Sequence, residues 1–339
     1  MTLSQTAALT KQIIFLSIFA LVLGTVSLIG YRIWYANYLA SLPPVEEKPD
    51  AKFGLLPLPD FPKALVSSSN FSYSVDTSTG NLPKVGVDPG FEKLIKVYFV
   101  TKTAASLLSA EKSQRLAEKF DIKTPSEVLS ETNYRFKSNE KTLTIDLSSG
   151  NFTFQNNLTI SEKTALDDDK KLIADFGRIL ENLEVYNEDL RSGRSNIIRL
   201  ETEPDVAQIS LWPSPVDNKL IFTPQFNTSL INARVYKSAD NLVNYASLNF
   251  TYYPVELSTF TTYPLKTAEE AFTDLKGGKG VVIIEPTKPQ VSITSIYLGY
   301  FLSENYTAYL QPIFVFEGPH FVAYVSAVSS EFVSSAEAR

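Results

Sequence analysis

The residues of this 339-residue chain that could do chemistry are few and scattered. Its single histidine, His320, lies in the segment Gly318-Pro-His-Phe, between two strand-like runs. A catalytic triad needs a particular serine and aspartate beside the histidine, and the sequence holds no G-x-S-x-G elbow to supply the serine. We therefore interpret this turn histidine as incidental.

Two further patterns resemble functional motifs. Ser109-Ala-Glu-Lys112 fits S-x-x-K, the motif of serine-acylating enzymes. The partner motifs S-D-N and K-T-G are absent, however, and Ser109 is better explained as a helix cap. Gly277-Gly-Lys-Gly280 resembles a phosphate-binding loop, but these glycines end a predicted helix, whereas such a loop precedes its helix. Neither pattern predicts a catalytic site.

The acidic residues also single out no site. Asp167 to Asp169 could offer oxygen ligands to calcium, but consecutive carboxylates at a helix start point in different directions and lack the calcium-loop spacing. Nothing distinguishes a glycosidase-like pair among the 37 acidic residues. We predict no catalytic residue, no cofactor and no metal.

The composition excludes several classes of protein. Without cysteine, the chain has no disulfides, no thiolate metal site and no cysteine nucleophile. Of its 31 basic residues only Lys11 and Arg32 precede Glu46, while all 37 acidic residues lie at or after Glu46, so the remainder carries a net charge of −8. Such a surface repels nucleic acid, and we predict no nucleic-acid partner.

An apolar run stands out near the amino terminus. Residues 13–30 (IIFLSIFALVLGTVSLIG) hold eighteen residues without a charge, about 27 Å of helix. Aromatic residues suited to a headgroup region follow this run: Tyr31, Trp34, Tyr35 and Tyr38. We interpret residues 13–35 as a transmembrane helix that holds the chain in the membrane. A cleaved signal peptide is the alternative, but the run exceeds a typical h-region.

The flanking segments complete this prediction. Residues 1–12 form a short tail, which favours a cytoplasmic amino terminus and an extracytoplasmic carboxy-terminal domain at the cell membrane. Residues 36–66 are rich in proline and predict a semi-extended stalk. Residues 331–339 are predicted to be a disordered tail. Several N-x-S/T patterns are present, but a cysteine-free domain of this size is more typical of a bacterial protein.

The rest of the chain alternates between helical and strand-like patterns. The first unit, residues 67–160, has strand-like segments 71–75 and 94–100, a helix that starts at Ser109, and three alternating segments that predict a β meander.

The second unit, residues 161–256, opens with the strongest amphipathic helix, over residues 172–183, and continues with five strand-like segments. The third unit, residues 257–330, opens with the capping box Thr267-Ala-Glu-Glu270 and ends in four strand-like segments. We therefore predict an α+β fold in which a transmembrane helix precedes two or three repeats of one helix packed on an antiparallel β meander.

Residues 263–328 carry a family resemblance. The segments Tyr263-Pro-Leu-Lys-Thr-Ala-Glu-Glu-Ala-Phe, Ile296-Tyr-Leu-Gly-Tyr-Phe and Phe321-Val-Ala-Tyr-Val-Ser-Ala-Val resemble the carboxy-terminal part of YycH/YycI-type proteins. The resemblance implies a single-pass bacterial membrane protein with PepSY-like extracytoplasmic repeats that modulates a sensor histidine kinase. It implies no catalytic residues, and such a resemblance identifies fold better than function.

Aromatic residues crowd the end of the chain. Most are expected to be core, because adjacent strand residues fall on opposite faces and one face must pack on the preceding helix. If the other face is uncovered, it is an interaction surface, since tyrosine and phenylalanine are enriched at interfaces. The candidate residues are Tyr297, Tyr300, Tyr306, Tyr309, Phe321 and Tyr324.

These observations favour a non-enzymatic regulatory module, anchored outside the cytoplasm, that binds another membrane or envelope protein. The alternative is a cell-envelope enzyme or a glycan-binding protein. A deep pocket lined by convergent carboxylates would favour that alternative, whereas shallow surfaces alone would argue against it.

Overall fold

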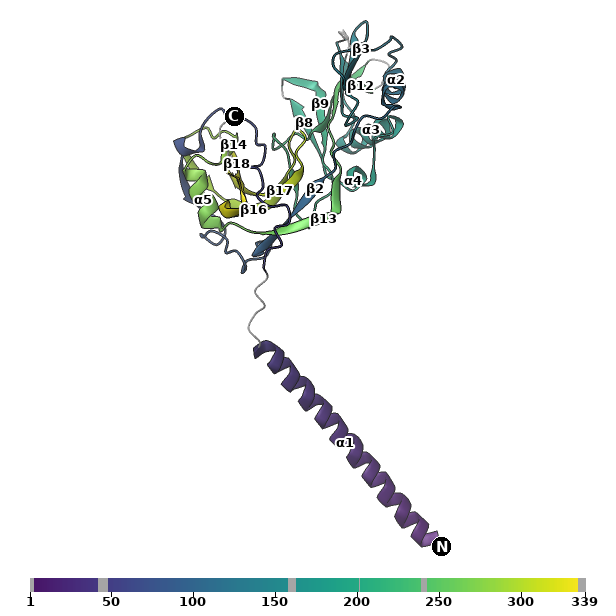
Figure 1. Cartoon of the computed structure of the whole chain (residues 1–339), viewed down its shortest axis with the longest axis vertical. Coiled ribbons are helices and arrows are strands. Elements are labelled where there is room, and N and C mark those ends of the chain that lie inside the picture. Colours follow the sequence, from purple (N-terminus) through teal and green to yellow (C-terminus); the bar gives the residue numbers. More distant parts are fainter. Residues whose placement is uncertain (1–2, 42–47, 158–162, 201, 239–242, 335–339) are drawn as a thin grey trace. The chain divides into compact units, whose positions relative to one another are not determined.

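The computed structural model describes residues 3–41, 48–157, 163–200, 202–238 and 243–334, which belong to two compact units, residues 1–48 and 49–339. The helices are α1 (Leu3–Ser41), α2 (Ser109–Lys119), α3 (Asp169–Asn182), α4 (Glu188–Arg191) and α5 (Ala268–Lys276), with short 3₁₀ turns at Ser68–Asn70 and Ser330–Phe332 (Figure 1). The strands are β1 (Ser72–Val75), β2 (Leu94–Val100), β3 (Glu127–Val128), β4 (Asn133–Ser138), β5 (Lys141–Asp146), β6 (Phe152–Asn156), β7 (Lys163–Thr164), β8 (Ser195–Leu200), β9 (Glu203–Leu211), β10 (Ile221–Phe222), β11 (Ile231–Ser238), β12 (Val243–Phe250), β13 (Val255–Pro264), β14 (Val281–Ile284), β15 (Gln290–Ile293), β16 (Ser295–Phe301), β17 (Tyr309–Gly318) and β18 (Phe321–Ser326).

Helix α1 differs from the transmembrane helix predicted over residues 13–35. It is 39 residues long and runs without a break from Leu3, within the predicted tail of residues 1–12, to Ser41. Among the residues that the structure describes, no helix is long and apolar enough to cross a membrane. The single-pass, signal-anchor assignment was therefore wrong, and the apolar run is one part of a longer helix with polar sequence at both ends.

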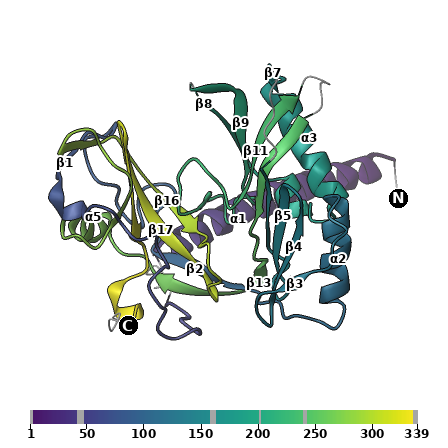
Figure 2. The same cartoon turned by 90° about the horizontal axis from the view of Figure 1, so that it is seen from above.

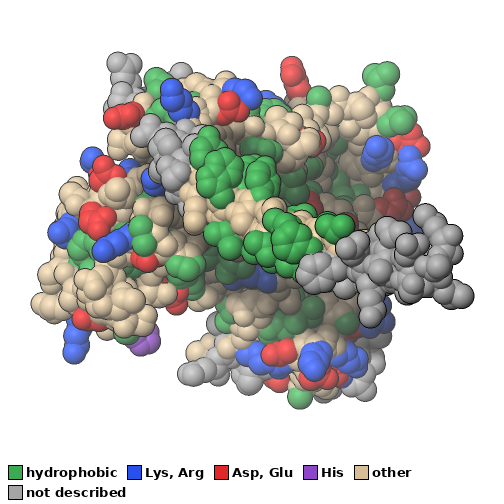
Figure 3. Space-filling model, turned by 90° about the horizontal axis from the view of Figure 1, so that it is seen from below, with side chains coloured by type: hydrophobic (Ala, Val, Ile, Leu, Met, Phe, Trp, Pro, Cys, Tyr) green, Lys and Arg blue, Asp and Glu red, His purple; other side chains and the backbone are tan. Residues whose placement is uncertain are grey.

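Many of the large hydrophobic side chains that are exposed in the described residues belong to α1. They lie between Leu16 and Tyr38, and the green side chains next to the grey residues in Figure 3 include them. Aromatic rings stack along the end of this stretch, with the centroids of Tyr31 and Tyr35 5.9 Å apart. The described surface of α1 between Leu16 and Tyr38 is therefore largely apolar.

The larger sheet of the second unit has nine strands. Their order is β3-β4-β5-β6-β12-β11-β9-β8, with β7 paired to β11, and every pair is antiparallel. Helices α2 and α3 lie on this sheet (Figure 2). The spacing of Leu172, Phe176 and Leu180 places them on one stripe of α3, and all three are buried against the sheet. The helix predicted over residues 172–183 is confirmed.

The second sheet has seven strands. β10, β16, β17, β18 and β14 follow one another, and β2 joins them by pairing with both β13 and β17. Helix α5 covers one face, where Ala271 and Leu275 contact a cluster that includes Phe314. On the opposite face Phe301 and Tyr324 belong to a buried cluster, and the ring of Phe61, from the segment before β1, packs against both. Burial of β17 and β18 on both faces explains their continuous apolar runs.

The predicted fold class, α+β with two or three serial repeats, was wrong. The chain is mostly β, with 38% strand and 22% helix. Strands predicted to lie in separate first and second units share the larger sheet, where Phe154 of β6 is opposite Leu248 of β12. Strand β2, from the predicted first unit, pairs with β13 and β17 of the second sheet. Alternating apolar residues predict a strand, but they do not say which distant strand it pairs with.

Residues 49–66, in the predicted stalk, are part of the folded unit. Leu56 is fully buried in a cluster with Val97, Tyr263 and Val328. Its backbone N–H donates to the carbonyl of Phe332 at 2.8 Å, which also fixes part of the predicted tail of residues 331–339. A semi-extended spacer would not be buried in this way. The predicted stalk residues 42–47 and tail residues 335–339 lie outside the described residues.

Candidate functional site

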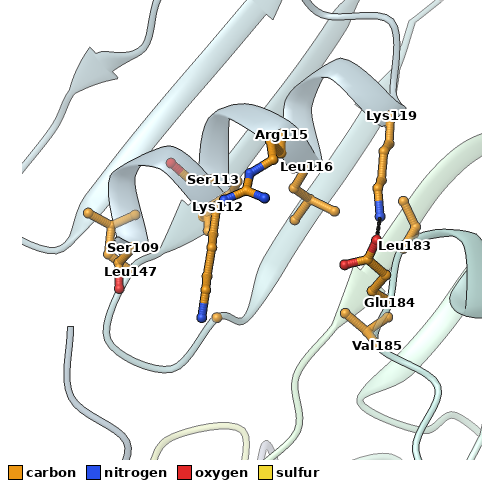
Figure 4. Close-up of a pocket in the computed structure, with 12 residues that line it drawn as sticks. Ser109, Lys112, Ser113, Arg115, Leu116, Lys119, Leu147, Leu183, Glu184 and Val185 are labelled. Atoms are coloured by element: carbon orange, nitrogen blue, oxygen red, sulfur yellow. Dashed lines mark ion pairs between the residues drawn. The ribbon is translucent and has the colours of Figure 1, made fainter. Parts of the chain in front are cut away.

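A pocket of about 390 Å³ lies between α2, the β5–β6 turn and the residues that follow α3 (Figure 4). We call it the α2 groove. Helix α2 contributes Ser109, Lys112, Ser113, Arg115, Leu116 and Lys119, and the other walls consist of Ile145, Leu147, Gly150, Leu183, Glu184 and Val185. The groove is thus formed by three segments that are far apart in the sequence.

The periodicity of α2 decides which side chains reach the groove. Ser113 and Ala117 are buried towards the sheet. Lys112, Arg115 and Lys119 follow one another at i, i+3 and i+7, which places them along one side of the helix over about 10 Å. Basic side chains therefore line the helix side of the groove.

The floor of the groove is aliphatic. Ile145 is buried, and the partly buried Leu116, Leu147 and Val185 pack against the same core. Leu183 completes the apolar floor and is also buried. A ligand that fits this groove must present an apolar surface to the floor and negative charge to α2.

The positive side chains of the groove are only weakly neutralised. Lys119 Nζ lies 2.8 Å from a carboxylate oxygen of Glu184, and this hydrogen bond lowers the pKa of the Glu184 carboxyl. Arg115 pairs with Glu111 at 3.2 Å, and both side chains are largely exposed. Within the described residues, Lys112 has no ion pair. Exposed ion pairs contribute only about 0–1 kcal/mol to stability. A carboxylate of a ligand can therefore replace Glu111 or Glu184 as the partner of the basic side chain.

The motif Ser109-Ala-Glu-Lys112 lines the groove, but its serine is held by other contacts. The N-cap of α2 is Leu108, so the prediction that Ser109 caps the helix was wrong. The hydroxyl of Ser109 instead accepts a hydrogen bond from the backbone N–H of Ser106 at 2.9 Å. Among the described residues, its contacts are with Ser106 and none is with Lys112. The arrangement lacks the nucleophile–base contact of acylating enzymes.

The three aspartates before α3 are held by local contacts. Asp167 pairs with Lys171 and Lys237, each at 3.0 Å. Asp168 is the N-cap of α3 and accepts from the backbone N–H of Lys171. Asp169 pairs with Arg199 (2.7 Å). Where the chain is described, the structure contains no group of three side chains that could hold a metal ion.

His320 and the glycines near residue 278 lie in a turn and at a helix end. His320 is exposed in the β17–β18 turn and has a positive φ of 53°. The capping box of Thr267 and Glu270 starts α5, as predicted, and Gly277 ends the helix. Gly278, with φ of 83°, then takes a left-handed conformation that favours glycine. These residues shape turns and caps.

The six aromatic residues predicted as an interaction surface do not form one surface. Tyr300, Phe321 and Tyr324 are buried core residues, and they belong to three different hydrophobic clusters. Tyr297 is partly buried and its hydroxyl donates to Glu317 at 2.8 Å. Tyr306 and Tyr309 line a separate pocket. Sequence reasoning missed the α2 groove, although the spacing of Lys112, Arg115 and Lys119 was a readable signal.

Comparisons with known proteins identify no family for this chain. No family model matches the chain, and no curated protein matches it. A solved structure of an uncharacterized protein from Eubacterium rectale is similar, with 13% sequence identity and a TM-score of 0.42. The similarity covers 86% of this chain and 95% of that chain.

Proposed function

We propose that this protein is a non-enzymatic binding module whose α2 groove receives an acidic amphipathic helix of a protein partner. The observation that carries the proposal is the row of Lys112, Arg115 and Lys119 beside an aliphatic floor, in a chain with a net charge of −6. An amphipathic helix places its apolar side chains in a groove at i, i+3, i+4 and i+7. The same spacing separates the basic residues of α2.

The chemistry of the groove favours binding. The ammonium and guanidinium groups of α2 are complementary to negative charge on a partner, which raises the rate of association. The aliphatic side chains of the floor bury apolar surface of the partner, which contributes to affinity. Figure 4 shows Lys112 extended from α2 across the groove and Lys119 in contact with Glu184 at its other end. A partner carboxylate near Lys112 would gain a contact without displacing an existing ion pair, since Lys112 has none among the described residues.

Exposed apolar residues extend the surface at the start of α2. Leu107 is fully exposed and Leu108 is 55% exposed, and both directly precede the groove residue Ser109. Side chains of this kind lose contact with water when a partner covers them. The bound helix is therefore expected to continue past the groove over the amino-terminal end of α2.

Reversing the charge of α2 tests the proposal. The ligand is a fluorescent helical peptide with a leucine stripe and glutamates at i, i+3 and i+7, and its affinity for the full chain is measured by fluorescence polarisation. The double variant Lys112→Glu/Arg115→Glu is expected to bind about 30-fold more weakly or worse, because like charges then face each other in the groove.

The matched control is Lys63→Glu/Lys288→Glu, which makes the same change of net charge at exposed residues outside the groove. We expect it to bind the peptide within about twofold of the unaltered chain at physiological salt, where distant charges are screened. An equal loss in both variants would show that only net charge matters. That result, or no binding of the peptide to the unaltered chain, would overturn the proposal.

A further inference from the structure

Another pocket, of about 350 Å³, is lined by residues at the carboxy-terminal end of α5, in β18 and in the segment 330–334. We call it the Lys279 pocket. Pockets that hold small molecules have volumes of about 300–1,000 Å³, so this one is large enough for a small ligand. It shares no lining residue with the α2 groove.

A largely buried ammonium group in the wall of this pocket has hydrogen-bond donors to spare. The Lys266 side chain is 8% exposed, and its Nζ donates to Asp274 Oδ2 at 2.8 Å. An ammonium group has three N–H donors. Among the described residues, Asp274 is the one acceptor for the Lys266 ammonium. Because buried donors need partners, an acceptor in the pocket would stabilise this group.

The charged side chains that line the pocket have a net positive charge. Lys279 Nζ lies 3.1 Å from the other oxygen of Asp274, Oδ1, so one carboxylate is shared by two ammonium groups. The Lys279 side chain is 74% exposed and can turn to a ligand, because Asp274 then keeps its buried partner Lys266. The exposed Glu331 follows the lining residue Ser330 but does not line the pocket. The pocket therefore attracts an anion.

The surroundings of the two lysines favour an anion with a single charge. Asp274 lies in the last turn of α5, and the carboxy-terminal end of a helix carries partial negative charge. A phosphate monoester has a charge of about −1.5 to −2 at neutral pH, and only one ammonium charge is left to compensate it. The described lining residues also include no arginine, whose fork of donors suits phosphate. A carboxylate fits these charges better.

The apolar part of the pocket is aliphatic. Leu58, Val325 and Val333 belong to its walls. Leu58 is 49% exposed, so a ligand that covers it removes apolar surface from water. A short alkyl chain that ends in a carboxylate matches this combination of aliphatic walls and ammonium groups.

We propose that the Lys279 pocket binds a short aliphatic carboxylate. Its carboxylate accepts hydrogen bonds from the ammonium groups of Lys279 and Lys266, and its alkyl chain packs on Leu58, Val325 and Val333. A free aliphatic acid and the carboxy terminus of a peptide that ends in leucine both present this chemistry. The site is independent of the α2 groove, so the two proposals stand or fall separately.

The test is a ligand-observed NMR titration of the full chain with isovalerate. Lys279→Met removes the exposed ammonium and is expected to weaken binding about tenfold. Leu58→Ala removes part of the aliphatic wall and is expected to weaken it about threefold. The matched controls are Lys276→Met, at an exposed residue of α5, and Leu55→Ala, at a 63% exposed leucine. Neither residue lines the pocket, and both controls should bind as the unaltered chain does.

Three further ligands separate the contributions of charge and shape. Isoamyl alcohol has the same alkyl chain without the charge and is expected to bind about tenfold more weakly than isovalerate. Inorganic phosphate has charge without the chain and should not displace isovalerate. Acetyl-Gly-Leu distinguishes the two sources: equal or weaker binding than isovalerate supports a free acid, and tighter binding supports the carboxy terminus of a peptide.

Binding of isovalerate that Lys279→Met and Leu58→Ala weaken, and that the controls leave unchanged, would support the site. The proposal is overturned if isovalerate does not bind, if isoamyl alcohol binds equally well, or if phosphate displaces the acid. An equal loss in the pocket variants and their controls would also overturn it.

Discussion

Replacement of Lys266 by methionine is expected to lower the free energy of unfolding by about 3 kcal/mol, because it leaves a buried carboxylate without its main partner. The Lys266 side chain is 8% exposed and its Nζ lies 2.8 Å from Asp274 Oδ2. Asp274, on α5, is itself 14% exposed. Lys279 also contacts Asp274, at 3.1 Å, but its side chain is 74% exposed and its charge is largely screened by water.

A double-mutant cycle with urea denaturation checks this expectation. Asp274→Asn alone should also be destabilising, whereas Lys266→Met/Asp274→Asn should recover part of the loss, since neither charge is then buried alone. Lys52→Met, which breaks the exposed Lys52–Asp50 contact, is the control and should change stability by less than about 1 kcal/mol. If the two single losses simply add in the double variant, the ion pair does not act as a buried unit.

The same pair gives stability a dependence on pH. Burial raises the pKa of Asp274, but the hydrogen bonds and charges of Lys266 and Lys279 outweigh burial, so the pKa is lowered in the folded chain. A lowered pKa stabilises the fold above the unfolded-state pKa of about 3.9, and this stabilisation is lost as the pH falls through the folded-state value. Asp274→Asn should therefore flatten the acid side of the stability profile.

Leu56→Ala is expected to destabilise the fold by about 3 kcal/mol, within the range for buried leucines. The smaller side chain leaves a cavity among Val97 of β2, Tyr263 of β13 and Val328, because these side chains are themselves fully buried and can collapse only partly into the space. Leu58→Ala is the matched control: Leu58 is 49% exposed, and its loss should change stability by about 0.5 kcal/mol or less. Thermal or urea unfolding of both variants measures the difference.

The outcome for Leu56 decides whether residues 49–66 belong to the core or form a spacer. In a spacer, both leucine variants would be nearly neutral. In the structure, Leu56 forms an isolated parallel β-bridge with Val333, and its carbonyl accepts a hydrogen bond from the backbone N–H of Ser334 at 2.8 Å. These contacts hold residues near the two ends of the second unit together. Small and equal effects at both positions would contradict this packing.

Local signals were enough to predict individual helices. The Asp167 to Asp169 entry predicted the start of α3, and the capping box and glycines predicted both ends of α5, because capping depends on residues within one turn. Strand partners were not predictable in this way. β2 pairs with β13, and β6 pairs with β12, through contacts between residues far apart in the chain. The serial-repeat prediction therefore failed at the level of pairing.

For the candidate sites too, local features could be predicted from the sequence and long-range contacts could not. The basic row on α2 is visible in the sequence, whereas the aliphatic floor comes from β5 and from residues after α3, which only the folded sheet brings together. The aromatic residues of β17 and β18 were ambiguous, because a continuous apolar run gives no sign of whether its second face is covered. Phe61, which comes before β1, packs against Phe301 and Tyr324 on that face, and Tyr324 is a core residue.

The most direct test of the central claim is a selection of a random peptide display library against the full chain, followed by lysine crosslinking of the enriched peptides. We expect enrichment of sequences with acidic and aliphatic residues at helical spacing, crosslinks to Lys112 or Lys119, and loss of the enrichment with Lys112→Glu/Arg115→Glu. Enrichment of sequences without acidic residues, or crosslinks confined to lysines outside the α2 groove, would contradict the proposed function.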